Sequence, residues 1–165
     1  MPRPPGLKRL LLLRHAKAEP AEASLEDIDR PLSARGRHEA RDAAHSIAEA
    51  RLDCDALLSS PAVRARQTAS IVARELDLPA PTIESDLYPG EPGAILRVLR
   101  RCPEQRRTVL LVGHNPGISE LAQRFHGAAP PVELHTAGLC LIELSPDTAW
   151  VDLRPKDAAR VSVLR

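Results

Sequence analysis

The chain has 165 residues, which is enough for one domain with a sizeable core, and 23 basic against 22 acidic residues leave a net charge of +1. This balance excludes a strong field for nucleic acid or an anionic membrane, and one Phe, one Trp and one Tyr are too few for a base-stacking surface. Three widely spaced cysteines fit neither a disulfide framework nor a zinc site, and we find neither a signal peptide nor a membrane-spanning run, so we expect a cytoplasmic protein.

The first predicted element is a buried strand from about Lys8 to Leu13, because residues 10–13 are consecutive leucines. Arg14 and His15 follow the strand at its carboxyl end, which is the edge of an open α/β sheet where ligands bind. We expect residues 1–6 to be a flexible tail and residues 19–29 to be a polar, acidic loop.

Two helices separated by a short strand are predicted next. Ser33 is a typical N-cap for a helix whose apolar face is formed by Ala40, Ala44, Ile47 and Ala48. A short strand over residues 56–58 leads to Ser60 and Pro61, which we interpret as the N-cap and the first residue of a second helix. The apolar stripe of that helix is formed by Ala65, Ala69, Val72 and Leu76.

A second buried strand, residues 108–112, repeats the pattern of the first, because an apolar run again ends just before a histidine, His114. Between the second helix and this strand, a third helix is predicted around residues 94–101. After the strand, Asn115 as an N-cap and Pro116 as a first helical residue predict a fourth helix. Its apolar residues are Ile118, Leu121, Ala122 and Phe125.

The last predicted element is a hairpin of residues 139–144 and 149–153, and residues from about 155 to 165 are expected to be a flexible tail. The alternation of strands and helices predicts an α/β fold with a mainly parallel central sheet flanked by helices, a three-layer sandwich. We expect it to form a single domain over residues 1–165.

His15 and His114 are both expected at the carboxyl edge of this sheet. Arg14 lies next to the first histidine, and the second directly precedes a predicted helix N-terminus. Free backbone N–H groups and the helix dipole at such a terminus favour an anion. Two histidines, an arginine and a helix N-terminus therefore predict a phosphate site.

Four motifs resemble those of the histidine phosphatase superfamily, in order and in spacing. They are Arg14-His15, then Asp29-Arg30-Pro31-Leu32-Ser33 with Gly36, then Leu58-Ser59-Ser60-Pro61 followed by Arg64-Ala65 and Gln67-Thr68, then Val112-Gly113-His114. The resemblance covers about residues 8–153. The short chain, the compact middle, Thr136 and Trp150 are most similar to the SixA-type phosphohistidine phosphatases. The resemblance implies a phosphoglycerate-mutase-like fold and a phosphatase that acts through a phosphohistidine intermediate.

The resemblance also implies a role for each matched residue. His15 is expected to be the nucleophile, with its tautomer fixed by a backbone carbonyl. Arg14 and Arg64 are expected to clamp the phosphate, because a planar guanidinium binds two phosphate oxygens at once. His114 is expected to donate to the phosphoryl oxygens as charge develops on them. Neither a metal nor another cofactor is expected.

Three further residues, Lys17, Arg30 and Thr136, are candidates for substrate binding. The alternative for Lys17 is a solvated loop lysine, and the alternative for Arg30 is a residue that orients its loop. Four other polar residues, in the motifs or directly after them, are interpreted as helix caps (Ser60 and Asn115) or as helix-surface and supporting residues (Gln67 and Thr68).

Two departures from the family pattern stand out. Ala16 follows the Arg-His pair where the superfamily usually has glycine, so the loop there either sits differently or does not need a positive φ. The larger family members carry a general-acid glutamate in a longer middle insertion. Here the nearest equivalents are Asp86, a possible general acid, and Glu91.

The sequence leaves three functions open. The first is dephosphorylation of a phosphohistidine in a partner protein, which the missing glutamate favours because an imidazole leaves more readily than an alkoxide. The second is hydrolysis of a small phosphomonoester such as a sugar or nucleotide phosphate, which requires a working acid. The third is a phosphate-binding module without turnover. A mutase activity is disfavoured by the short middle segment.

Overall fold

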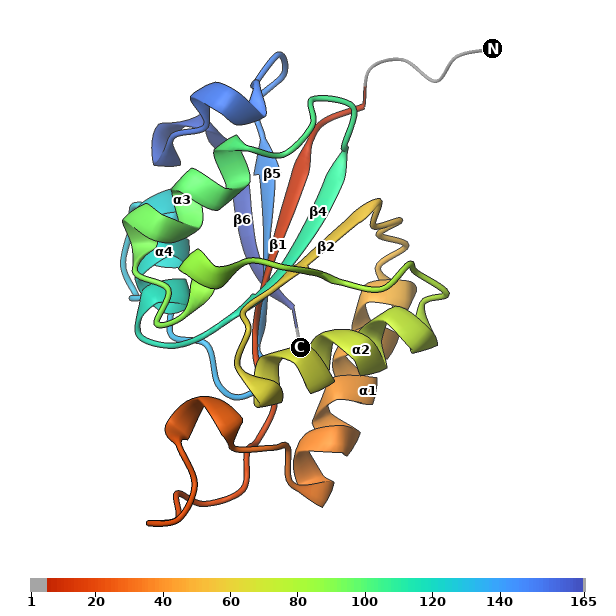
Figure 1. Cartoon of the computed structure of the whole chain (residues 1–165). Coiled ribbons are helices and arrows are strands. Elements are labelled where there is room, and N and C mark those ends of the chain that lie inside the picture. The colour runs from red at the N-terminus through yellow and green to blue at the C-terminus, as the bar shows by residue number, and fades with distance from the viewer. Residues whose placement is uncertain (1–5, 165) are drawn as a thin grey trace.

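A six-stranded sheet in the order β3-β2-β4-β1-β5-β6 forms the centre of the molecule (Figure 1). The computed structural model describes residues 6–164. Strands β1 to β4 run parallel, whereas β5 pairs antiparallel with β1 and with β6. The strands are β1 (Arg9–Arg14), β2 (Ala56–Ser59), β3 (Thr82–Ile83), β4 (Thr108–Gly113), β5 (Leu139–Leu144) and β6 (Ala158–Leu164).

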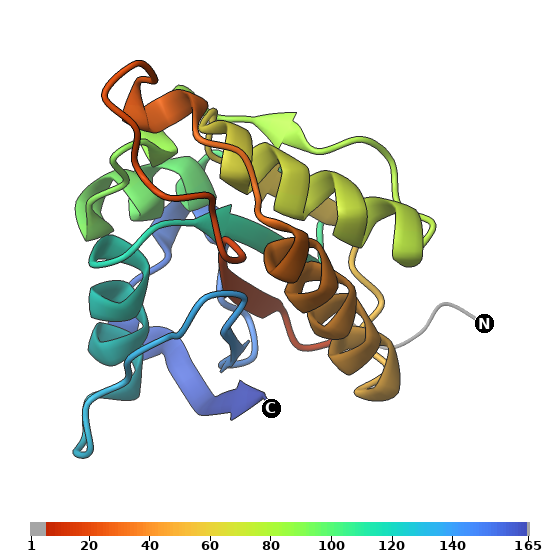
Figure 2. The ribbon, with the colours of Figure 1, turned by 90° about the horizontal axis from the view of Figure 1, so that it is seen from below.

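Helices cover both faces of the sheet (Figures 1 and 2). They are α1 (Ala34–Glu49), α2 (Val63–Glu75), α3 (Pro92–Arg100) and α4 (Gly117–His126). Leu11 and Leu13 of β1 pack into one core cluster with α1 and α2, while Leu10 and Leu12 pack into another with α3 and α4. All four leucines are fully buried, which explains the unbroken apolar run. The predicted α/β sandwich with its mainly parallel sheet is confirmed.

The start of α1 follows the prediction, and the start of α2 does not. The Ser33 hydroxyl accepts a hydrogen bond from the Gly36 N–H at 3.0 Å, as an N-cap does. Ala48 was expected on the buried face of α1 but is exposed, and Ala43 is buried in its place. Helix α2 begins at Val63 rather than at Pro61, and the Ser60 hydroxyl accepts from the Ala62 N–H and also contacts His114.

The predicted cap of α4 is also wrong. The helix begins at Gly117, and no side chain caps it. The Asn115 amide instead donates to the carbonyl of Leu134 at 2.8 Å and accepts from the Ser119 hydroxyl at 2.6 Å. Asn115 therefore ties the loop before β5 to the end of β4, and this contact competes with capping.

The predicted hairpin and the predicted C-terminal tail are both wrong. Residues 150–152 form a 3-10 helix in which Trp150 is buried and its indole donates to the Arg106 carbonyl at 2.8 Å. The antiparallel partner of β5 is β6, so residues 158–164 form an edge strand of the sheet. The expected N-terminal tail lies outside the described residues, except for Gly6. Within residues 6–164, no helix is long and apolar enough to cross a membrane.

Candidate active site

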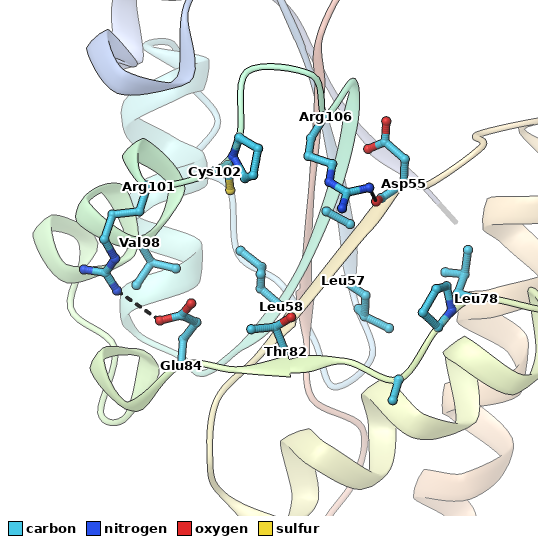
Figure 3. Close-up of a pocket in the computed structure, with 14 residues that line it drawn as sticks. Asp55, Leu57, Leu58, Leu78, Thr82, Glu84, Val98, Arg101, Cys102 and Arg106 are labelled. Carbon is cyan, nitrogen blue, oxygen red and sulfur yellow. Dashed lines mark hydrogen bonds and ion pairs between the residues drawn. The ribbon is translucent and has the colours of Figure 1, made fainter.

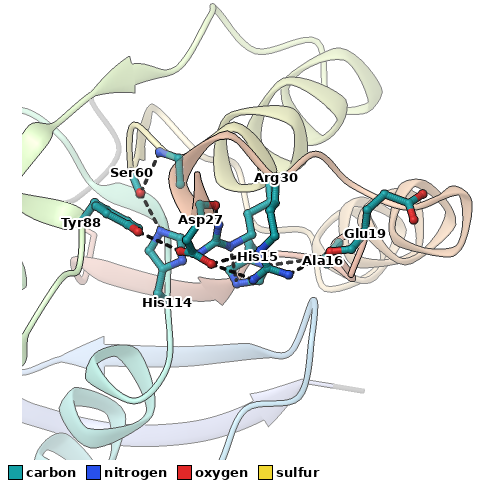
Figure 4. A network of polar contacts seen from close by, with 10 residues as sticks. His15, Ala16, Glu19, Asp27, Arg30, Ser60, Tyr88 and His114 are labelled. Carbon is teal, nitrogen blue, oxygen red and sulfur yellow. Dashed lines mark hydrogen bonds and ion pairs between the residues drawn. The ribbon is translucent and has the colours of Figure 1, made fainter. Parts of the chain in front are cut away.

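His15 and His114 meet because β1 and β4 are neighbours in register. Arg14 and Gly113, the last residues of the two strands, are paired, so the residue directly after each strand is a histidine. The His15 N–H donates to the Gly113 carbonyl at 3.0 Å, and the two imidazole rings lie 5.0 Å apart. Both side chains are buried, with 8% and 5% of their residue surfaces exposed. The predicted pair of histidines at the sheet edge is therefore present as one buried cluster (Figure 4).

The tautomer of His15 is set by the backbone. Its Nδ1 lies 2.8 Å from the carbonyl oxygen of Ala16, and because a carbonyl only accepts, Nδ1 carries the proton. The Nε2 atom of the neutral ring then holds a lone pair. Arg64 Nε donates to this atom at 3.3 Å. Nε2 is thus the atom of His15 that carries a free lone pair, and it faces a cation.

His15 stays neutral at ordinary pH. Burial, and then the nearby charges of Arg64, Arg14 and Arg30, lower its pKa to about 4, although the bond to Ala16 acts in the opposite direction. A neutral ring is what nucleophilic attack requires, because an imidazolium has no free lone pair.

His114 has the opposite arrangement of its two nitrogens. Its Nε2 lies 2.6 Å from the hydroxyl of Ser60, which itself accepts from the Ala62 N–H at 3.2 Å. The contact takes up only one of the two protons, and we assign the Ser60 proton to the bond with Nε2, which places the ring proton of His114 on Nδ1. No described residue accepts a hydrogen bond from this buried Nδ1. Burial, and then the charges of His15 and Arg64, lower the pKa of His114 to about 3.

Arg64 is held in place by the loop that carries Asp27, and the sequence analysis did not connect this loop with Arg64. Its Nη1 donates to the main-chain oxygen of Asp27 at 2.6 Å, and its Nη2 donates to Asp27 Oδ2 at 2.9 Å. The same carboxylate accepts from the hydroxyl of Tyr88 at 2.8 Å and from Arg30 Nε at 3.0 Å. The bond from Tyr88, and then those from Arg64 and Arg30, lower the pKa of Asp27 to about 2. Asp27 is therefore a carboxylate beside the two histidines.

Arg14 contacts the loop that precedes β5 rather than the Asp27 loop. Its Nη1 donates to the carbonyl of Leu134 at 3.1 Å, the same carbonyl that Asn115 holds. Its Nε is buried and has no hydrogen-bond partner among the described residues. Burial lowers the pKa of Arg14, and Glu133 and Glu39 act against this shift. At least one donor of this guanidinium remains for an anion.

Of the three predicted substrate-binding residues, the structure places the side chain of Arg30 in the cluster but not those of Lys17 and Thr136. Arg30 joins the cluster through Asp27, and its Nη1 also donates to the Glu19 carbonyl at 2.8 Å, so it both orients the loop and lies near His15. Lys17 is exposed, and its side chain forms no polar contact within the described chain. Thr136 is half-buried and has no side-chain hydrogen bond to the cluster, although its neighbour Ala137 donates its N–H to the His15 carbonyl at 3.1 Å.

Asp86 and Glu91 do not join the cluster. The Asp86 carboxylate is exposed and pairs with Arg101 at 3.3 Å, and no polar contact links it to either histidine. Glu91 is exposed at the start of α3. The carboxylate in the cluster is Asp27, which binds Arg64 and Tyr88 and comes from the loop after β1, so a search for an acid in the middle segment could not find it.

Ala16 needs no glycine-like backbone. It is absent from the positive-φ residues of the described chain, and it is fully buried. Its N–H donates to the Thr68 hydroxyl at 3.0 Å, which in turn donates to the Arg64 carbonyl at 2.8 Å. Thr68 therefore connects the residue that orients His15 with the helix that carries Arg64.

Three residues of the site were missed or given another role: Asp27, Tyr88 and Ser60. Asp27 lies in a stretch rich in acidic residues that offered no motif. Tyr88 did offer a sequence signal for a site residue, because it is the only tyrosine of the chain. In the structure its ring packs edge-on against that of His114, with 5.4 Å between the ring centres. Ser60 was part of a matched motif but was interpreted as a cap.

A separate cavity of about 300 Å³ lies between the start of β2, β3 and the end of α3 (Figure 3). None of the four predicted catalytic residues lines it. Among residues 6–164, no group of three or more His, Cys, Asp or Glu side chains is placed to hold a metal ion. The cations that the structure places around His15 are the guanidinium groups of Arg14, Arg30 and Arg64.

Comparison with known proteins agrees with this geometry. Residues 10–87 match the family model of the histidine phosphatase superfamily (branch 1). A protein of Agrobacterium tumefaciens assigned to the SixA phosphohistidine phosphatases is 32% identical, with a TM-score of 0.76 over 82% of this chain and 91% of that one. The chain belongs to the histidine phosphatase superfamily, and it is a phosphatase.

Within the superfamily, the chain is similar to SixA-type proteins over its whole length. A protein of Nakamurella multipartitia with the same assignment superposes with a TM-score of 0.81 at 26% identity, covering 99% of this chain and 98% of that one. The structure of a protein histidine phosphatase SixA complexed with tungstate gives a TM-score of 0.73 at 28% identity, over 82% of this chain and 88% of that one.

Proposed function

We propose that the protein is a metal-independent phosphatase that removes the phosphoryl group from a phosphohistidine in a partner protein, through a phosphohistidine intermediate on His15. The observation that carries this proposal is the fixed tautomer of His15. Its Nδ1–H is bound to the Ala16 carbonyl at 2.8 Å, which leaves Nε2 as a neutral nucleophile beside Arg64. The SixA structures support the choice of substrate, because they are assigned to phosphohistidine phosphatases.

In the first step, Nε2 of His15 attacks the phosphorus and the phosphorus–nitrogen bond of the substrate breaks. The departing imidazole takes up a proton from solvent. The new bond leaves a positive charge on the His15 ring, and the Nδ1–H bond to Ala16 stabilises this cationic form. In the second step, water attacks the phosphorus, inorganic phosphate leaves, and His15 returns to its neutral form.

The remaining residues bind the phosphoryl oxygens. Arg14 and Arg64 supply guanidinium donors near His15, and the Nδ1–H of His114 supplies a neutral donor on a ring whose centre lies 5.0 Å from that of His15. A phosphoryl group that binds Arg64 competes with Asp27 for the same donors. We therefore expect Asp27 to move from Arg64 when an anion binds.

The choice of a phosphohistidine substrate also follows from the acids near the site. The Asp27 carboxyl has a pKa of about 2 and is ionised, so it cannot protonate a leaving group at neutral pH. An alkoxide leaving group needs such a proton, whereas an imidazole depends on it less. This difference favours a phosphorus–nitrogen bond over a phosphomonoester.

The test is hydrolysis of a chemically phosphorylated phosphohistidine protein and of a panel of phosphomonoesters, in a chelating buffer, by the wild-type protein and by His15→Ala. We expect kcat/KM to be highest for the phosphoprotein and turnover to be lost in the variant. A preference for a small ester would assign the protein to metabolite hydrolysis. Activity that survives in His15→Ala would contradict the mechanism for both substrates.

A further inference from the structure

A groove between α1 and α2 carries four arginines that the proposed reaction does not use. The two helices lie side by side on one face of the sheet (Figure 2). The groove has a volume of about 440 Å³ and is lined by Arg37, Arg41, Val63, Arg66, Gln67, Ser70, Ile71 and Arg74. Its charge is therefore +4 within a narrow region of a protein whose net charge is +1.

Within residues 6–164, these arginines are not paired with a carboxylate. No carboxylate lines the groove, and within residues 6–164 none of the four guanidinium groups forms a salt bridge or a side-chain hydrogen bond. The cavity of Figure 3 differs in this respect, because Arg101 pairs there with Glu84. The α1/α2 groove is thus a cationic surface that is left for an external anion.

The spacing of the charges indicates the shape of that anion. Arg37 and Arg41 are four residues apart on α1, and Arg66 and Arg74 are eight apart on α2. At 1.5 Å per helical residue, the row on α2 is about 12 Å long. Like charges at i, i+4 spacing destabilise the helix that carries them, so the arrangement does not stabilise the fold. By the same rise the row on α1 is about 6 Å long. The two rows together fit an acidic helix, whereas one phosphate engages only one or two guanidinium groups.

The groove begins next to the active site. Val63, the first residue of α2, lines the groove and directly precedes Arg64, whose Nε lies 3.3 Å from His15 Nε2. Gln67, which lines the groove, accepts the N–H of Leu32 at 2.8 Å and so contacts the end of the loop that carries Asp27. A partner that lies along the groove therefore reaches the edge of the site with one of its ends.

We propose that the groove docks an acidic helix of the phosphohistidine-bearing protein and thereby presents its phosphohistidine to His15. This inference rests on the proposed function and names the surface chemistry of its partner. Docking through four arginines increases the association rate and makes it sensitive to salt. Recognition of the partner then depends on charges outside the catalytic cluster.

The test uses two synthetic helical peptides that carry the same phosphohistidine, one flanked by four glutamates at i, i+4 spacing and one with glutamines in their place. The variant is Arg41→Glu/Arg74→Glu, and the matched control is Arg97→Glu/Arg124→Glu, which changes the same charge on exposed arginines of α3 and α4. Thermal melting of both variants reports folding.

We expect the groove variant to lose tenfold or more of kcat/KM for the glutamate peptide at low salt, roughly as for other charge-steered complexes. Its kcat/KM for the glutamine peptide should stay within twofold of wild type.

Reversed charges provide a rescue. A third peptide with lysines in place of the glutamates should be hydrolysed faster by the groove variant than by the wild type. Equal kcat/KM of the wild type for the glutamate and glutamine peptides would overturn the proposal, as would an equal loss in the control variant. Tighter binding of a single-stranded RNA of equal charge at the same salt would also overturn it, in favour of a nucleic-acid partner.

Binding of the unphosphorylated peptides, measured by fluorescence anisotropy, separates this inference from the proposed function. If the glutamate peptide binds the wild type and not the groove variant, but no phosphohistidine peptide is hydrolysed, the docking surface stands and the proposed substrate is wrong. If phosphohistidine is hydrolysed and the three peptides bind equally, the substrate stands and the docking surface is wrong.

Discussion

His15 and His114 occupy equivalent places, one residue beyond two neighbouring parallel strands, yet their rings are held in opposite ways. The Ala16 carbonyl places the proton of His15 on Nδ1 and exposes Nε2, whereas the Ser60 hydroxyl binds Nε2 of His114 and leaves Nδ1–H as a donor. Both rings are neutral, because burial lowers their pKa values to about 4 and about 3. In the proposed mechanism, this difference lets one residue type serve as nucleophile at His15 and as donor at His114, according to a single hydrogen-bond partner.

The largest effect is expected from removing the nucleophile. His15→Asn should lower kcat by a factor on the order of 10⁴ or more, because no other described side chain presents a neutral nitrogen lone pair to the same position. The measurement is phosphate release under single-turnover conditions, with thermal melting as the control for folding. A loss below about tenfold would mean that the two histidines do not differ in role as described.

Removing the donor should cost less than removing the nucleophile. His114→Ala should lower kcat by about 10² to 10³, the usual loss for one donor to a developing oxyanion. The variant should still form the phosphoenzyme on His15, only more slowly. A rapid-quench time course checks this, and a loss as large as that of His15→Asn would contradict the assignment of His114 as a donor.

The partner of His114 offers a finer test. Ser60→Ala removes the hydroxyl that binds Nε2 and frees the ring to adopt either tautomer, so we expect kcat to fall about tenfold. The matched control is Ser59→Ala, since the Ser59 hydroxyl is buried next in sequence but donates to the Ser60 carbonyl rather than to a histidine. Equal losses in the two variants would indicate a packing effect instead.

Asp27 should weaken the binding of anions. In Asp27→Asn the side chain keeps its shape but loses its negative charge beside Arg64, so inhibition by inorganic phosphate should become about fivefold tighter. Asp29→Asn is the control, because that exposed carboxyl lies in the same loop and has no polar contact with the cluster. Weaker inhibition in Asp27→Asn would mean that Asp27 chiefly positions Arg64.

The smallest effect is expected from pH. Neither histidine should titrate between pH 8 and 5, because both pKa values lie near 4 or below. The unfolded chain binds these protons near pH 6.5, so stability should be unaffected above that value and should fall as the pH drops from 6.5 toward 4. Imidazole ¹⁵N NMR checks that neither histidine titrates between pH 8 and 5, and the same spectra show whether the two rings have opposite tautomers. A ring that titrates near 6.5 would contradict the described burial.

Much of the fold could be predicted from local pattern. Four consecutive leucines in β1 and the apolar run of β4 predicted buried strands, and the strand ends then placed His15 and His114 at one edge. The C-terminal region could not be predicted in this way. Trp150 sits in a segment with strand-like composition, but its indole bonds to the Arg106 carbonyl, a contact 44 residues away in sequence that no local pattern contains.

The site was predictable where a motif names the residue and not where a loop folds back onto it. Arg14, His15, Arg64 and His114 lie in matched motifs, and the structure gathers all four. Their tautomers and their neighbours depend on tertiary contacts. Asp27 reaches Arg64 across 37 residues, and Ser60 reaches His114 across 54, so both roles needed the folded chain.

The most direct measurement of the central claim is to trap the phosphoenzyme by rapid quench into alkali and to locate the phosphoryl group by mass spectrometry and ³¹P NMR. The account predicts a single adduct on Nε2 of His15, present in His114→Ala and absent from His15→Asn. An adduct on His114, on Nδ1 of His15, or on a residue other than histidine would contradict it.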